Sequence, residues 1–282
     1  MDAAPPAAPV WFITGCSTGL GRVLVQELLA AGHRVAATAR GPETLTGLDP
    51  GDPARFLALG LDVTDSDQVA AAVEAARARF GRLDVLVNNA GYGVVGALEE
   101  VPEPEIRRVF ETNVFGLMAV TRAVLPLMRA QGSGVVLNIS SIAGFTATPG
   151  FGIYNATKFA VEGLSEALAL DVAKLGIRVH IIEPGPFRTD FAGRSIVDTP
   201  PLEAYAATVD ATRRYVRDID GKQKGDPVRA AREMIRLVEE GSPSLRVLLG
   251  KVAVDRMKLK LRQVGRELEA GEATALAMDF PD

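Results

Sequence analysis

The chain has 282 residues, of which 48% are hydrophobic and 23% are charged, a balance typical of a folded globular protein. Its net charge of −4 argues against a nucleic-acid partner, which usually meets a basic protein face. No apolar run approaches the ~20 residues that cross a bilayer, so we expect no stable membrane insertion. The single cysteine cannot form an intramolecular disulfide, which favours a reducing, cytoplasmic location.

The pattern of the chain predicts one domain with a short arm at one end and a helix at the other. Residues 1–9 are rich in Ala and Pro and lack the basic and apolar regions of a signal peptide, so we expect a flexible arm. Residues 10–250 contain no linker that would divide them. Helical periodicity continues over 251–282 and predicts a C-terminal extension of the same domain.

Short apolar segments alternate with amphipathic ones along the domain. The predicted strands cover residues 10–14, 34–39, 56–61, 85–88, 135–139, 177–182 and 245–249. The predicted helices cover about 19–31, the segment from a cap at Thr64 to about Phe80, 104–129 with an irregularity at Pro126, and 154–175. Strands joined through helices require right-handed crossovers between parallel strands. The sequence therefore predicts an α/β, Rossmann-like doubly wound sheet of about seven parallel strands with helices on both faces.

A glycine-rich turn follows the first predicted strand, with the spacing G-x-x-x-G-x-G at Gly15, Gly19 and Gly21. Glycine permits a tight turn and the close approach of a pyrophosphate, and the following helix N-terminus favours anions. The spacing differs from the usual G-x-G-x-x-G fingerprint, so a turn without a ligand is the alternative. The other residues of the turn that we expect against a dinucleotide are Ser17, Thr18 and Leu20.

Arg40 follows the second predicted strand, where a carboxylate would accept hydrogen bonds from a ribose 2′-hydroxyl. No carboxylate stands at that point, and an arginine pairs instead with a 2′-phosphate. We therefore expect NADP(H) as the cofactor rather than NAD(H). A solvated loop charge is the alternative for Arg40.

Further motifs follow in order along the chain: Asp62-Val63-Thr64, Asn88-Asn89-Ala90-Gly91, Asn113, Ser140-Ser141, Tyr154-x-x-x-Lys158 and Pro184-Gly185-x-x-x-Thr189. In this order and at these separations they resemble the classical short-chain dehydrogenase/reductase family over about residues 10–249. The stretches TGCSTGLG and YNATKFAVEGLSEAL further resemble the branch that holds 17β-hydroxysteroid and retinol dehydrogenases. One departure is Thr157, where the family usually has serine, and this change keeps the hydroxyl.

The resemblance implies an oxidoreductase that interconverts a carbonyl and a secondary alcohol with NADP(H), and that forms a homodimer or homotetramer. It implies that Asp62 and Val63 flank the adenine, and that Asn113 holds a water linking Lys158 to solvent. The alternative for Asn113 is a helix-interior side chain bonded to backbone. The residues that it implies beside the ribose and the nicotinamide are Asn89, Ala90, Gly91, Pro184, Gly185, Phe187 and Thr189.

Tyr154 and Lys158 are four residues apart in a predicted helix and therefore share one face. An ammonium favours the phenolate, so we expect Lys158, together with an oxidised nicotinamide, to lower the pKa of Tyr154. Tyr154 is then the predicted acid and base. Ser141, just past the fifth strand, is the predicted donor to the substrate oxygen, and family spacing favours it over Ser140. For the isolated tyrosine and lysine motif, a solvated helix face is the alternative.

Residues 186–225 follow the sixth strand, and we expect them to form a lid over a hydrophobic pocket for a small-molecule substrate. The apolar residues that we expect around the pocket are Tyr92, Val94, Val95, Phe145, Phe151, Phe187, Phe191 and Tyr205. No cluster of His, Cys or carboxylate residues predicts a metal site. Two other functions stay open on this fold: a dinucleotide-sensing regulator, and a lyase or dehalogenase.

The C-terminal extension carries an apolar stripe made of Met257, Leu261, Val264 and Leu268. We expect this stripe to pack over the core or over a neighbouring subunit, with the basic residues of the helix in solvent. A helix lying on a membrane surface is the alternative.

Overall fold

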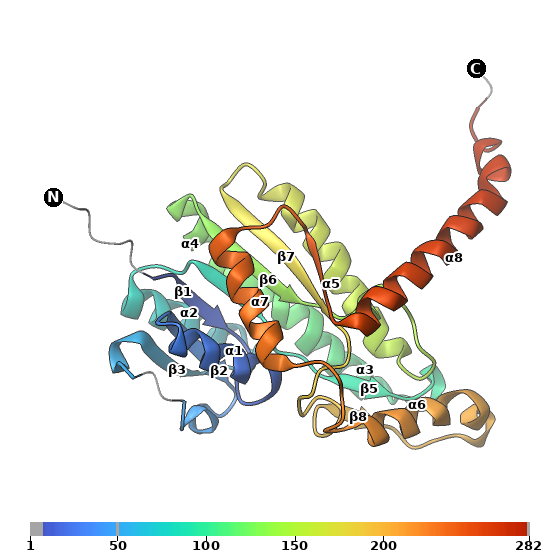
Figure 1. Cartoon of the computed structure of the whole chain (residues 1–282), viewed down its shortest axis with the longest axis horizontal. Helices are drawn as coiled ribbons and strands as arrows, with labels where there is room; N and C mark the ends of the chain where they lie inside the picture. The colour runs from blue at the N-terminus through green and yellow to red at the C-terminus, as the bar shows by residue number, and fades with distance from the viewer. Residues whose placement is uncertain (1–7, 49–50, 281–282) are drawn as a thin grey trace.

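The computed structural model describes residues 8–48 and 51–280, so most of the expected arm at 1–9 lies outside the described residues. Seven parallel strands form one sheet in the order β3-β2-β1-β4-β6-β7-β9, which confirms the predicted fold (Figure 1). The strands are β1 (Val10–Ile13), β2 (Arg34–Ala39), β3 (Phe56–Gly60), β4 (Val85–Asn88), β6 (Gly134–Ile139), β7 (Ile177–Pro184) and β9 (Arg246–Leu249).

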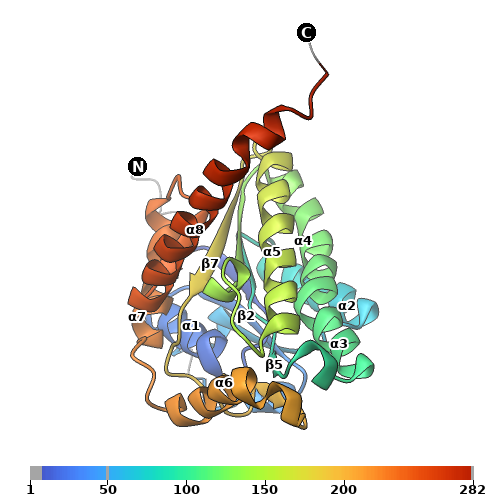
Figure 2. The same ribbon diagram turned by 90° about the vertical axis from the view of Figure 1, so that its right-hand side faces the viewer.

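Helices cover both faces of the sheet (Figures 1 and 2). One face carries α1 (Gly19–Ala30) and α7 (Pro227–Glu240), and the other carries α2 (Ser66–Phe80), α4 (Leu117–Gln131) and α5 (Gly152–Asp171). Strand β1 shows how the sequence builds two cores. Trp11 and Ile13 join the core under α1 and α7, whereas Val10 and Phe12 join the core under α2 and α4. Consecutive side chains of a strand alternate between faces, so an unbroken apolar run fills both cores.

Two helix expectations differ from the structure. The helix expected over about 104–129 consists of α3 (Glu103–Phe110), a π-helical segment (Glu111–Gly116) and α4, with Pro126 inside α4. The expected cap at Thr64 is wrong, because one oxygen of Asp65 accepts the backbone N–H groups of Asp67 and Gln68, both at 3.0 Å. The Thr64 hydroxyl donates instead to Asp62.

A second, small sheet pairs β5 (Gly93–Val95) with β8 (Ile196–Asp198) in parallel, and the sequence pattern did not predict it. Strand β8 and helix α6 (Ala206–Ile219) come from the expected lid and lie at the end of the molecule where the strands of the main sheet finish (Figure 2). The segment expected as a lid thus contains a strand and a helix, and its role as a lid stays a prediction.

Helix α8 (Lys251–Leu276) extends away from the body (Figure 1). Of the expected apolar stripe only Met257 is buried, whereas Leu261, Val264 and Leu268 are exposed. Packing over the core of the same chain is thus wrong for the outer part of the stripe, and packing against a neighbouring subunit stays a prediction. Among the residues that the structure describes, no helix combines the length and the apolar composition needed to span a membrane.

Candidate active site

A cavity of about 1490 Å³ opens at the carboxyl ends of the strands, where the strand order reverses between β1 and β4. Ligands of doubly wound sheets bind at this kind of switch point. All but two of the predicted site residues lie in its wall: Gly15, Ser17, Thr18, Gly19, Leu20, Arg40, Asp62, Val63, Asn89, Ala90, Gly91, Ser141, Tyr154, Lys158, Pro184, Gly185, Phe187 and Thr189. Gly21 and Asn113 lie behind it. Within the described ranges, no group of three or more His, Cys, Asp or Glu side chains is placed to hold a metal.

The glycine turn packs directly on the end of β4. Gly15 has φ of +71°, and a Cβ added there would lie 2.8 Å from the Ala90 Cα atom, so a side chain is excluded on both counts. A Cβ on Gly21 would lie 2.7 Å from the Gly15 carbonyl oxygen. Asn89 stabilises the turn, because its side-chain amide donates hydrogen bonds to the carbonyl oxygens of Thr14 at 2.8 Å and Gly15 at 2.9 Å.

This turn leaves a backbone cradle at the start of α1. The first turn of α1 contains no acidic residue, and Thr18 at its N-cap position makes no side-chain cap bond. Free N–H groups at a helix N-terminus favour an anion, so the cradle fits a pyrophosphate group. Cys16 lies inside the same turn and is fully buried.

Arg40 lies at the end of β2, exposed to solvent in the cavity wall. Its guanidinium has no ion-pair partner among residues 8–48 and 51–280. Asp62, the carboxylate on the neighbouring strand end, is engaged elsewhere, since its Oδ1 atom accepts the N–H and hydroxyl of Thr64 at 2.9 and 2.8 Å. This position of the site therefore carries a positive charge that is available to a ligand.

Tyr154 and Lys158 lie on the inward face of α5, and both side chains are buried. The Lys158 ammonium lies 5.8 Å from the centroid of the Tyr154 ring and donates to the Ile139 carbonyl at 2.8 Å. Ser141 follows β6, accepts the Ala143 N–H at 3.0 Å and has its hydroxyl next to the Tyr154 phenol. The three side chains thus converge in the wall of the cavity.

Burial is the largest influence on the pKa values of this group. Burial raises the pKa of Tyr154, and the hydrogen bond from Ser141 only partly opposes this. Burial likewise lowers the pKa of Lys158 to about 8, against an opposing effect of Glu162. The pKa of Tyr154 is thus raised by burial in the protein alone, and the lowering that we expect from Lys158 together with an oxidised nicotinamide stays a prediction.

Asn113 is buried in the π-helical segment behind this group. Its side chain accepts the Tyr92 N–H at 3.0 Å, and donates to the Tyr92 carbonyl at 2.9 Å and to the Thr157 hydroxyl at 3.1 Å. Gly91 separates it from Lys158, since a Cβ there would lie 3.0 Å from the Asn113 Oδ1 atom and 3.8 Å from the Lys158 Nζ atom. The backbone bonds agree with the alternative interpretation, and the relay water stays a prediction.

A buried acidic pair behind Lys158 was not found by sequence reasoning. Glu162, one turn after Lys158 on α5, and Glu183 near the end of β7 both lie 3.2 Å from the Arg246 Nε atom. Burial and the neighbouring Glu162 raise the pKa of Glu183 to about 8. Lys158 and Glu162 have helical spacing, but nothing in the sequence pairs them with β7 and β9.

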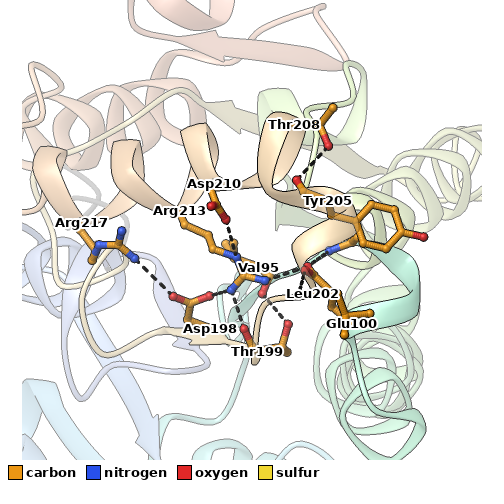
Figure 3. Close-up of polar contacts among 11 residues, drawn as sticks. Val95, Glu100, Asp198, Thr199, Leu202, Tyr205, Thr208, Asp210, Arg213 and Arg217 are labelled. Atoms are coloured by element: carbon orange, nitrogen blue, oxygen red, sulfur yellow. Dashed lines mark hydrogen bonds and ion pairs between the residues drawn. The ribbon is translucent and has the colours of Figure 1, made fainter.

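Sequence reasoning also gave no indication of a buried arginine on the inner side of α6. Figure 3 shows Arg213 of α6 at the centre of an acidic cluster, with its Nη2 atom 2.7 Å from Glu100 and its Nη1 atom paired with Asp198. Glu100 also accepts the backbone N–H groups of Ala97 at 2.6 Å and Leu202 at 2.7 Å. Arg213 thus joins α6 to the segment after β5 through a buried ion pair, and to β8 through a second pair with a partly exposed carboxylate.

Four of the eight apolar residues expected around the pocket lie in the cavity wall. Tyr92, Phe151, Phe187 and Phe191 line the cavity, with the Phe191 ring 5.7 Å and the Phe151 ring 5.9 Å from the Tyr154 ring. The remaining expectations are wrong. Val94 and Val95 are buried within β5, Phe145 packs beside the start of α8, and the Tyr205 hydroxyl donates to Glu99 at 2.7 Å outside the cavity.

The chain is similar to known proteins over most of its length. The family model for short chain dehydrogenases matches residues 9–199. An oxidoreductase of Botryotinia fuckeliana (strain B05.10), BOA17, is 40% identical over 247 residues, which is 87% of this chain and 90% of that protein. The crystal structure of a short-chain dehydrogenase from Streptomyces avermitilis superposes with a TM-score of 0.90 at 44% identity, covering 96% of this chain and all of that one.

Two further solved structures contain a nicotinamide dinucleotide. An alcohol dehydrogenase from the archaeon Thermococcus sibiricus, in complex with 5-hydroxy-NADP, has a TM-score of 0.70 at 25% identity, with 86% of this chain and 96% of that chain covered. A 3-ketoacyl-(acyl-carrier-protein) reductase from Brucella melitensis, in complex with NADH, has a TM-score of 0.71 at 28% identity, with 86% and 97% covered. These relatives support a nicotinamide cofactor without choosing between its two forms.

Proposed function

The chain belongs to the short-chain dehydrogenase family, and on that premise we propose an NADP(H)-dependent oxidoreductase that interconverts a carbonyl and a secondary alcohol on a hydrophobic small molecule. The observation that carries the proposal is the convergence of Ser141, Tyr154 and Lys158 on a cavity that also contains the glycine turn. The proposal includes a cytoplasmic location and a homo-oligomer. Membership of the 17β-hydroxysteroid and retinol dehydrogenase branch stays a prediction.

The glycine turn and the three side chains have different roles in the proposed mechanism. The backbone of the glycine turn would hold the pyrophosphate, and the nicotinamide ring, when bound, would supply or accept hydride. In the reducing direction Tyr154 donates its proton to the substrate carbonyl oxygen, and Ser141 donates a hydrogen bond to the same oxygen as charge develops there. In the oxidising direction the phenolate of Tyr154 takes the proton of the alcohol, and the Lys158 ammonium favours this phenolate form over the phenol.

The preference for NADP(H) rests on Arg40. Its guanidinium lies at the end of β2 without a carboxylate partner among the described residues, where a 2′-phosphate would find a charge-assisted partner. A carboxylate at this point would instead favour the free 2′-hydroxyl of NAD(H).

The test is fluorescence titration of NADPH and NADH into the wild type, Arg40→Ala and the control Arg129→Ala, whose side chain is exposed on α4 away from the cavity. We expect Arg40→Ala to weaken NADPH binding by about tenfold to a hundredfold, the value of a hydrogen bond to a charged group, and to leave NADH binding unchanged. Equal loss for both nucleotides would contradict the 2′-phosphate role.

Ketone screening then separates the enzyme from the other two functions. Tyr154→Phe removes only the hydroxyl, and we expect it to lower kcat by at least about a hundredfold while NADPH still binds. Tight NADPH binding without turnover of any ketone would favour the dinucleotide-sensing regulator. Failure to bind either nucleotide would favour the lyase or dehalogenase.

A further inference from the structure

The charges in the cavity wall divide into two regions. The carboxylates of the wall, Asp62, Glu105 and Glu111, all lie on the side of the strand ends and α3, where the cofactor is proposed to bind. On the side formed by β8, α6 and α8, the charged residues of the wall are Arg194 and Arg256. The described part of the wall contains no carboxylate there, so the side next to the lid has a positive charge.

The two arginines differ in how that charge is balanced. Arg194 is exposed and forms an ion pair with Asp190 at 2.8 Å. Arg256, in the second turn of α8, is half-buried and has no acidic partner among the described residues. Its three hydrogen bonds all come from one nitrogen, Nη2, which donates to Thr148 Oγ1 at 2.7 Å and to the carbonyls of Ala147 at 3.2 Å and Thr146 at 3.4 Å.

The rest of the Arg256 guanidinium is free to bind a ligand. Neither Nε nor Nη1 has a hydrogen-bond acceptor within the described ranges, although a guanidinium carries five N–H donors arranged to meet a carboxylate with two bonds. Partial burial lowers the pKa of Arg256, and the phenol of Tyr215 on α6 only partly opposes this effect. An arginine nevertheless stays protonated at neutral pH.

Arg256 lies in the same part of the cavity as the proposed acid and base. The backbone carbonyl of its partner Thr148 accepts the Phe151 N–H at 3.1 Å, and the centroid of the Phe151 ring is 5.9 Å from that of the Tyr154 ring. The wall of this cavity also contains the apolar side chains of Phe151, Phe191, Val216 and Ile219, beside polar ones such as Tyr215. The cavity thus combines a phenol, apolar side chains and a guanidinium without an acidic partner among the described residues.

We propose that the substrate of this site is an amphipathic carbonyl compound whose apolar body carries a carboxylate, and that the free edge of Arg256 binds this carboxylate. The inference rests on the proposed function and names its substrate class. Because the unpaired charge is positive, an amine at the same end of the substrate would be repelled. A neutral ketone of the same shape would leave the guanidinium without a partner and would bind more weakly.

The probes are two aryl keto acids of different length, 3-benzoylpropionate and 6-oxo-6-phenylhexanoate, each compared with its methyl ester. Binding to the NADP-saturated protein is measured by calorimetry, and NADPH oxidation is measured separately. The variants are Arg256→Gln, which removes the charge, Arg256→Lys, which keeps it, and Lys258→Gln, which removes a charge of the same helix outside the cavity wall.

We expect the wild type to bind at least one acid about tenfold more tightly than its ester. Arg256→Gln should remove this difference by weakening the acid alone, Arg256→Lys should restore part of it, and Lys258→Gln should keep it. Equal weakening of acid and ester in Arg256→Gln would show that Arg256 only anchors α8 to Thr148 and would overturn the proposal. So would a wild type that does not prefer either acid.

The test of the carboxylate subsite can fail or succeed independently of the test of oxidoreductase activity. Selective binding of the acid that depends on Arg256 supports the carboxylate subsite even if NADPH is not oxidised. Failure to oxidise NADPH with any ketone, with this selective binding intact, counts against the oxidoreductase and not against the subsite.

Discussion

Glu183 illustrates how one buried residue makes the stability of the whole protein depend on pH. Its carboxyl faces Glu162 of α5 and Arg246 of β9, and its pKa rises from an ordinary value of 4.5 to about 8, chiefly through burial and then through Glu162. The folded protein therefore keeps this proton to a higher pH than the unfolded chain does. The resulting stabilisation is full below the unfolded pKa of about 4.5, declines as the pH rises, and is lost above the folded pKa of about 8.

Glu183→Gln should therefore flatten the pH dependence of thermal unfolding, because the amide stays neutral at every pH. Between pH 5 and pH 8 we expect the Tm of the wild type to fall by a few degrees more than that of the variant. Glu166→Gln serves as a control, since it removes an exposed carboxylate from the same arginine. Parallel Tm profiles for the wild type and Glu183→Gln would show that Glu183 is ionised in the folded protein.

At the scale of elements, α6 is joined to the segment after β5 by a buried ion pair. Arg213 places its buried guanidinium against the buried carboxylate of Glu100, and its neighbours Thr212 and Val216 line the cavity. Loss of the arginine leaves the Glu100 carboxylate buried without a counter-charge. Breaking such a pair costs about 3–5 kcal/mol, far more than the loss of an exposed pair.

We expect Arg213→Ala to lower the free energy of unfolding in urea by about 3–5 kcal/mol and to raise the KM for substrate, with little change in NADPH affinity. Arg217→Ala is the matched control, because Arg217 is exposed and its Nη1 atom lies 3.7 Å from the Oδ2 atom of Asp198 in the same cluster. It should change stability by about 0.5 kcal/mol or less. Similar effects of the two substitutions would show that the buried pair does not hold the lid.

Across the whole molecule, the features that the sequence predicted depend on local spacing, and those that it missed depend on distant pairing. Alternation of apolar strands with amphipathic helices predicts the doubly wound sheet, and the spacing of Tyr154 and Lys158 predicts their shared helix face. Arg213 and Glu100 are 113 positions apart, and no periodic pattern connects them. The π-helical segment around Asn113 likewise has no signal in a sequence that looks like one continuous helix.

In helix α8, only part of the apolar stripe is buried, and the sequence does not indicate which part. Helical periodicity correctly predicts the helix and its apolar stripe. The same periodicity does not indicate how many residues of the stripe pack against the body of the protein. Gly250, with φ of +88°, turns the chain from β9 into α8, after which only Ala253 and Met257 are buried. The direction in which the helix leaves the body thus decides which part of the stripe packs, and that direction depends on tertiary structure.

Cys16 gives the protein an internal chemical probe of its own glycine turn. It is the only cysteine of the chain, its thiol donates to the Ile13 carbonyl at 3.2 Å, and burial raises its pKa to about 12. A thiol reagent can therefore react only while the turn is transiently open. A dinucleotide that binds the closed turn should slow this labelling, by about a hundredfold at a hundred times its Kd. An unchanged labelling rate with NADPH bound would mean that nucleotide binding and the opening of the turn are independent.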